Sequence, residues 1–155
     1  MKKTAYQTAR CILYRGENKA ERYLLADHKG APRNRSTRQR ARARAANQIK
    51  WGLPGGHVEW REEAMEAARR EIYEELDVTL GKLIAVGDYS YKQHLHAVFA
   101  SQVEVEEFEL EFSELVAVRW FTLPEIARLR DFDQLHAGYE YDAVRALVAL
   151  LQAPH

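Results

Sequence analysis

One stretch of ten residues, RREIYEELDV from Arg69 to Val78, constrains the fold of this chain more than any other. Glu74 and Glu75 follow Glu71 by three and four residues, so in a helix all three lie on one flank. Like charges at these spacings destabilise an isolated helix by roughly 0.2–0.5 kcal/mol per pair. The two arginines of the stretch lie on the other side of the helix, and neither obviously reaches all three glutamates. The flank therefore needs another partner, either basic side chains or a bound cation.

Helical periodicity extends over about residues 62–76, and one face of this helix carries Ala64, Met65, Ala68, Ile72 and Leu76. The glutamates border this apolar face, where burying an unpaired charge costs several kcal/mol. On its own, the segment also fits a solvated helix with Glu–Arg pairs. The preceding GLPGG, residues 52–56, favours the cation, because glycines let backbone approach a ligand closely. Hard divalent cations such as Mg²⁺ bind carboxylates and substrate phosphates.

The segment Gly56–Val78, GHVEWREEAMEAARREIYEELDV, resembles the Nudix box, G-x5-E-x7-R-E-U-x-E-E-x-G-U, in which U is aliphatic. Eight of its nine specified positions match, and the flanking W-x-LPGG and VRWFTLPE are also similar to this family. Asp77 stands in place of the second glycine. That glycine ends the helix in a left-handed conformation, which Asp tolerates better than most residues. Every residue that would bind a metal is therefore present.

The rest of the chain predicts a mixed sheet with interspersed helices, an α/β (α+β) fold, in a single domain over residues 1–155. Strands are expected at residues 8–16, 22–28, within 49–60, and at 82–91, 94–105, 107–112 and 116–121. Helices are expected at 123–130, after a capping box from Thr122 to Glu125, and at 140–152. The inner face of the last helix carries Val144, Leu147, Val148 and Leu151. The resemblance implies the Nudix α/β/α sandwich around a mixed sheet.

The resemblance also implies an activity: hydrolysis of the pyrophosphate bond in a nucleoside diphosphate linked to another moiety, with Mg²⁺ or Mn²⁺ as cofactor. Carried over by position, the metal ligands are Glu71, Glu74, Glu75 and the carbonyl of Gly56. Arg70 would orient these glutamates through a salt bridge, with Glu59 or Glu62 as its partner.

Members of this family commonly recruit one more glutamate from a loop that precedes a W-F strand. Glu114, six residues before Trp120, is our candidate, and Glu111 is the second choice. The alternative is that both belong to a solvated acidic stretch. The general base is either Glu71 or Glu114, because enzymes of this family differ on this point.

A basic segment at about residues 29–48 lacks an apolar stripe and predicts a long loop; it carries Arg33, Arg35, Arg38, Arg40, Arg42 and Arg44. It is either a solvated loop or a flap that binds substrate phosphates. An RNA-directed hydrolase is a further alternative, although no aromatic residue interrupts the segment to stack bases. The substrate stays open, since Gln93 and Leu95 replace the proline and tyrosine typical of ADP-ribose and dinucleoside polyphosphate hydrolases.

Residues that could contact a base or a second metal are weaker candidates. Tyr89, Tyr91, Phe99 and Trp51 could stack on a base, but such side chains more often belong to the core. His94 and His96 alternate in a strand and face the same side, which alone is a weak metal signal.

Composition bounds the class of protein. Lys plus Arg and Asp plus Glu both number 23, so net charge favours no nucleic-acid partner. Cys11 is the single cysteine, which excludes an internal disulfide and fits a cytoplasmic protein. No apolar run approaches the roughly 18 residues of a membrane span. The expected partner is a small nucleotide, and a homodimer is compatible with the resemblance. A Nudix-fold module that binds a nucleotide without hydrolysing it is the alternative class.

Overall fold

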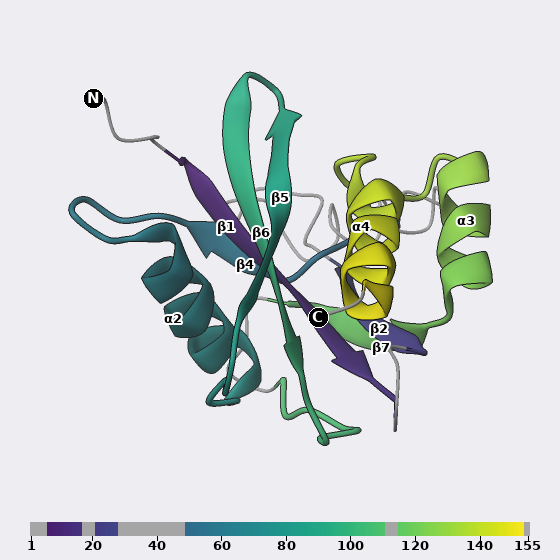
Figure 1. Cartoon of the computed structure of the whole chain (residues 1–155), viewed down its shortest axis with the longest axis horizontal. Helices are drawn as coiled ribbons and strands as arrows, with labels where there is room; N and C mark the ends of the chain where they lie inside the picture. The colour runs from purple at the N-terminus through teal and green to yellow at the C-terminus, as the bar shows by residue number, and fades with distance from the viewer. Residues whose placement is uncertain (1–5, 17–20, 28–48, 111–114, 154–155) are drawn as a thin grey trace, which may run out of the picture.

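A mixed β-sheet forms the centre of the computed structural model, which describes residues 6–16, 21–27, 49–110 and 115–153 (Figure 1). Its strands are β1 (Thr8–Arg15), β2 (Arg22–Asp27), β3 (Trp51–Gly52), β4 (Gly55–His57), β5 (Ile84–Tyr91), β6 (His94–Gln102) and β7 (Ala117–Phe121). They follow the order β3-β2-β1-β6-β5, with β4 beside β1 and β7 beside β2. The β1–β6 pair is parallel and the other strand pairs are antiparallel, so the expected mixed sheet is confirmed.

Helices cover both faces of this sheet (Figure 1). The helix α2 (Ala64–Leu76) packs on one face, while α3 (Leu123–Asp131) and α4 (Glu140–Gln152) pack on the other. The alternation of side chains along β1 serves both cores. Cys11 lies in the core under α2, and Ile12 lies in the core under α3 and α4. This arrangement is the expected α/β/α sandwich.

The helix ends follow local sequence signals. Thr122 and Glu125 form the expected capping box, because the Glu125 N–H donates to the Thr122 hydroxyl at 3.3 Å and the Thr122 N–H donates to the Glu125 carboxylate at 2.8 Å. Helix α2 begins at Ala64, two residues later than expected, because Glu63 is still extended. At its other end Asp77 adopts the left-handed conformation, with φ 56° and ψ 39°. None of the helices among the described residues is long and apolar enough to cross a membrane.

Two expectations from the sequence are wrong. The periodicity predicts Met65 on the apolar face of its helix, but this residue is 40% exposed. The buried face of α2 is formed by Ala67, Ala68, Ile72 and Leu76, and Met65 lies outside it in the first turn. The described part of the expected strand at 107–112 forms no strand. Phe108 and Leu110 instead pack singly against the core under α2, so their alternation reflects side-chain packing without strand pairing.

Candidate active site

Two glycines bring the chain close to the acidic flank of α2. Gly55 has φ +146°, and a Cβ atom there would lie 2.2 Å from the carbonyl oxygen of Ala9. A Cβ atom on Gly56 would lie 2.4 Å from the carboxyl carbon of Glu71. A side chain at Gly55 would collide with the backbone of β1, and a side chain at Gly56 would displace the carboxylate of Glu71. Strand β4 is thereby held between β1 and the helix.

Arg70 fixes the loop between β4 and α2 on the helix. Its guanidinium forms a bidentate pair with Glu62, with Nε 2.8 Å from Oε2 and Nη2 3.0 Å from Oε1. Its Nη2 also donates to the carbonyl of His57 at 3.0 Å. Glu59, the other partner suggested by the sequence, is 3.7 Å away and largely exposed. The hydrogen bonds from Arg70 hold the pKa of Glu62 below its usual range.

Arg70 also reaches two of the three glutamates. Its Nη1 donates to Glu71 at 3.0 Å and to Glu74 at 3.2 Å. This contact gives the acidic flank one positive charge and sets the orientation of both carboxylates. Glu74 is exposed and Glu71 is half-buried, so the two differ in their access to solvent. Glu75 is the carboxylate that Arg70 leaves unbalanced.

Glu75 lies deeper than the other two. Within the part of the chain that the structure describes, its Oε2 atom is buried and has no hydrogen-bond partner. Burial raises the pKa of Glu75 well above its usual range, and the adjacent negative charge of Glu71 raises it further. The positive charge of Arg10 and a hydrogen bond with the backbone of Gly55 oppose this rise only in part. The carboxylates of Glu71 and Glu75 are therefore only partly neutralised by nearby positive charge.

These features fit a divalent cation. A buried carboxylate oxygen without a partner, a second carboxylate beside it and a glycine backbone against that carboxylate are the oxygen donors such ions prefer. Among the described residues, however, no three acidic, histidine or cysteine side chains are gathered into a ready-made metal shell. The reason is the geometry of Arg70, which holds Glu71 and Glu74 in its own hydrogen bonds. Metal binding would thus require these carboxylates to turn.

The other residues that the sequence suggested for metal binding, proton transfer or phosphate binding lie outside the described residues: Glu111, Glu114, Arg33, Arg35, Arg38, Arg40, Arg42 and Arg44. Conversely, Arg10 lies close enough to Glu75 to lower its pKa, and the sequence reasoning missed it. A usable signal was present, because Arg10 is the one charged residue between Thr8 and Tyr14, in a strand whose other side chains are suited to burial.

Comparisons with known proteins agree with this geometry. The family model described as NUDIX domain matches residues 6–141. A NUDIX hydrolase from Nitrosomonas europaea superposes with a TM-score of 0.64 at 19% identity, covering 97% of this chain and 93% of that one. The NUDIX domain of Shewanella oneidensis NrtR, complexed with ADP ribose, gives 0.66 at 13% identity over 97% and 90%. A C. elegans Ap4A hydrolase gives 0.63 at 20% identity over 92% and 98%. At these identities the three structures establish a shared fold.

Proposed function

The chain belongs to the Nudix family of pyrophosphohydrolases, and from that premise we propose that it hydrolyses, with a divalent metal ion, a nucleoside diphosphate linked to another moiety. The observation that carries the proposal is the buried Oε2 of Glu75, which has no hydrogen-bond partner among the described residues and lies beside the carboxylate of Glu71. A buried carboxylate pair that is only partly neutralised lowers the stability of a fold and is typical of a functional site.

The chemistry assigns a role to each side chain. Glu71, Glu74, Glu75 and the Gly56 carbonyl would hold Mg²⁺ or Mn²⁺, which when bound supplies positive charge against the phosphoryl oxygens. Water attacks one phosphorus, the bond from that phosphorus to the bridging oxygen breaks, and two phosphate products leave. Glu71 or Glu114 accepts the proton lost by the water. Arg70 contacts no substrate in this scheme and keeps the carboxylates in place through Glu62.

A substrate panel tests this function. It should include ADP-ribose and Ap4A, named for two of the structural neighbours, together with nucleotide sugars and nucleoside triphosphates. We expect turnover of at least one compound with Mg²⁺ or Mn²⁺ and none in excess EDTA. Glu74→Gln and Glu75→Gln should each lower kcat by about 100-fold or more, the size of a single lost electrostatic contribution.

Glu66→Gln is the matched control, because Glu66 is an exposed glutamate of the same helix outside the site. Its kcat should equal that of the wild type. If no compound is cleaved while ADP-ribose still raises the melting temperature, the chain is a nucleotide-binding module and the hydrolase proposal is wrong.

A further inference from the structure

A second cluster of polar and aromatic side chains surrounds Arg10, on the face of the sheet away from α2. Alternation along β1 places Arg10 on the same face as Ile12, which packs under α3 and α4. Five rings from β5, β6 and the turn before α4 contact one another in this cluster: Tyr89, Tyr91, His96, His136 and Tyr139. The positive charge of Arg10 acts on the pKa of three of them, His96, His136 and Tyr139. The proposed metal site uses none of these rings.

Arg10 is fixed by two backbone carbonyls. Its Nη1 donates to the carbonyl oxygens of Leu53 at 3.2 Å and Gly55 at 3.0 Å. Its charge lies close enough to Tyr139 to oppose the rise in pKa that burial causes there, and it acts in the same way on the carboxyl groups of Glu75 and Glu140. The two carbonyls hold Arg10 in place, and neither of them carries a negative charge.

Tyr139 connects Arg10 to His96. The phenol oxygen lies 2.6 Å from Nδ1 of His96. Because Arg10 can only donate, the phenol oxygen faces a donor on that side, and the phenol proton is available to Nδ1. Burial, and then the positive charge of Arg10, lower the pKa of His96 to about 4, so at neutral pH the ring is uncharged and able to accept. The three side chains therefore form one polar group, in which the phenol proton is directed to His96.

The turn that supplies His136 and Tyr139 is itself built for rigidity. Glu140 is buried, and its carboxylate accepts from the N–H groups of Ala137 at 2.8 Å and Gly138 at 2.7 Å. The N–H of His136 donates to the carbonyl of Trp51 in β3 at 2.8 Å. The turn is thus tied to the helix behind it and to the strand beside it.

The rings of this cluster are packed on one another. Tyr89 stacks on Tyr139 with centroids 4.9 Å apart, and His96 meets Tyr139 edge to face at 5.5 Å. Tyr91 contacts His96 and His136 at 5.8 and 5.6 Å. These contacts occupy ring faces within the cluster and favour a ligand that meets N–H and O–H donors over a base that needs an open face. An oxygen-rich anion has this chemistry.

Neutralising Glu75 does not account for Arg10. The two side chains are close enough for Arg10 to lower the pKa of Glu75, yet the hydrogen bonds of Arg10 go to the carbonyls of Leu53 and Gly55. Meanwhile Oε2 of Glu75 has no hydrogen-bond partner among the described residues. A residue serving only as a counter-charge would bond to that oxygen. Gly55 separates the two groups, since its carbonyl accepts from Arg10 and its backbone also hydrogen-bonds with Glu75.

We propose that Arg10, beside the Tyr139–His96 pair, forms a phosphoryl-binding subsite, adjacent through Gly55 to the carboxylates. It would hold the phosphoryl group next to the one attacked by water, and it rests on the proposed function only for that last assignment. Binding of a phosphoryl anion at this subsite needs no metal ion.

Isothermal titration with inorganic pyrophosphate in excess EDTA tests the subsite directly. We expect the wild type to bind, Arg10→Met to weaken binding at least about 10-fold, as for a lost charge-assisted pair, and Tyr139→Phe to weaken it less. Glu75→Gln should bind about as well as the wild type, because it leaves Arg10 and the neighbouring rings unchanged. Tyr139→Phe keeps the ring and its packing, so it remains informative if Arg10→Met fails to fold.

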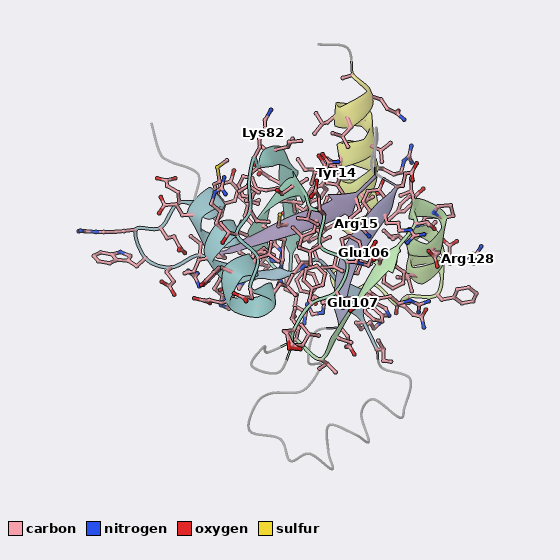
Figure 2. The ribbon with its side chains drawn as sticks, turned by 90° about the horizontal axis from the view of Figure 1, so that it is seen from below. Tyr14, Arg15, Lys82, Glu106, Glu107 and Arg128 are labelled. Atoms are coloured by element: carbon pink, nitrogen blue, oxygen red, sulfur yellow. The ribbon has the colours of Figure 1, made fainter. Side chains whose placement is uncertain are left out.

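Arg15→Met is the matched control. It removes the same charge from the same strand. Arg15 lies away from the cluster and forms an ion pair with Glu106, in which the two charged groups are 2.8 Å apart (Figure 2). Its affinity for pyrophosphate should not change. The subsite is excluded if the wild type does not bind in EDTA, or if Arg10→Met and Tyr139→Phe both bind as the wild type does. This readout needs no turnover, so failure of the hydrolase proposal and failure of the subsite give different results.

Discussion

Glu75 is a residue whose burial lowers the stability of the fold. Its carboxylate is buried, one oxygen has no partner among the described residues, and its nearest acidic neighbour repels it. Burial of a polar group without a hydrogen bond costs about 1–3 kcal/mol by mutational measures. Glu74 is chemically identical, yet it is exposed and bonded to Arg70. Two adjacent glutamates therefore contribute differently to the free energy of unfolding: burial makes Glu75 unfavourable, while the bond to Arg70 makes Glu74 neutral or slightly favourable.

We predict that Glu75→Gln is more stable than the wild type in EDTA, by about 1–2 kcal/mol. The amide has nearly the same shape, is uncharged, and can donate to the carboxylate of Glu71. Urea unfolding with linear extrapolation measures the difference. Glu74→Gln should change the free energy of unfolding little, because an exposed ion pair contributes about 0–1 kcal/mol. A less stable Glu75→Gln would show that the carboxylate already has a stabilising partner.

At the scale of one element, the end of α2 is less favourable than it could be. Asp77 ends the helix in the left-handed conformation, and its N–H donates to the carbonyl of Tyr73 at 2.9 Å. A side chain other than glycine is strained there, although Asp tolerates it better than most. The last turn of α2 carries no basic residue, so the charge of Asp77 also faces the negative end of the helix dipole.

Asp77→Gly should therefore raise the free energy of unfolding by about 0.5–1 kcal/mol, from relief of strain and removal of the unfavourable charge. Asp77→Ala is the contrasting variant: it removes the charge but keeps a Cβ at positive φ, so we expect it to lose about 1 kcal/mol. The midpoint of urea unfolding compares both with the wild type. If glycine also destabilises, the Asp77 side chain makes a favourable interaction that outweighs its strain.

Across the whole molecule, the two faces of the sheet carry different charged side chains. Helix α2 lies on one face of the sheet and carries the carboxylates, while α3 and α4 lie on the other face (Figure 1). Alternation along β1 places Arg10 on the face under α3 and α4. Gly55 in β4 is the place where they meet, since its backbone contacts both Arg10 and Glu75. The proposed metal site and the proposed phosphoryl subsite would therefore be separated by one short strand.

Local sequence signals predicted the parts of this arrangement that depend on nearby residues. The capping box at Thr122, the left-handed Asp77 and the spacing of the glutamates are all properties of a few adjacent positions. The burial of Glu75 and the cluster around Arg10 could not be predicted this way. They depend on the register of β1 against β4 and β6, which no local pattern specifies. The absence of a strand at 107–110 has a similar origin, because the pairing partner decides whether alternation becomes a strand.

The pH dependence of stability tests the packing of the whole domain at His96. Burial, then Arg10, lowers the pKa of His96 to about 4 in the folded protein, against about 6.5 in the unfolded chain; the other contributors are His94, His136 and His57. Between pH 6.5 and pH 4, His96 binds a proton in the unfolded chain but stays largely unprotonated in the folded protein. The stabilising contribution is therefore complete above pH 6.5 and is lost progressively as the pH falls toward 4.

Between pH 7 and pH 5, His96 should cost the wild type up to about 2 kcal/mol of its free energy of unfolding. Glu75 and Glu140 have raised pKa values and act in the opposite direction over this range, so a single protein would show only the sum. The difference between the wild type and His96→Gln cancels the contributions of Glu75 and Glu140, because both proteins contain both carboxylates. We expect the variant to be the less stable protein at pH 7, where it lacks the His96–Tyr139 bond, and to lose less on acidification. Equal losses in the two proteins would mean that His96 titrates alike in the folded and unfolded states.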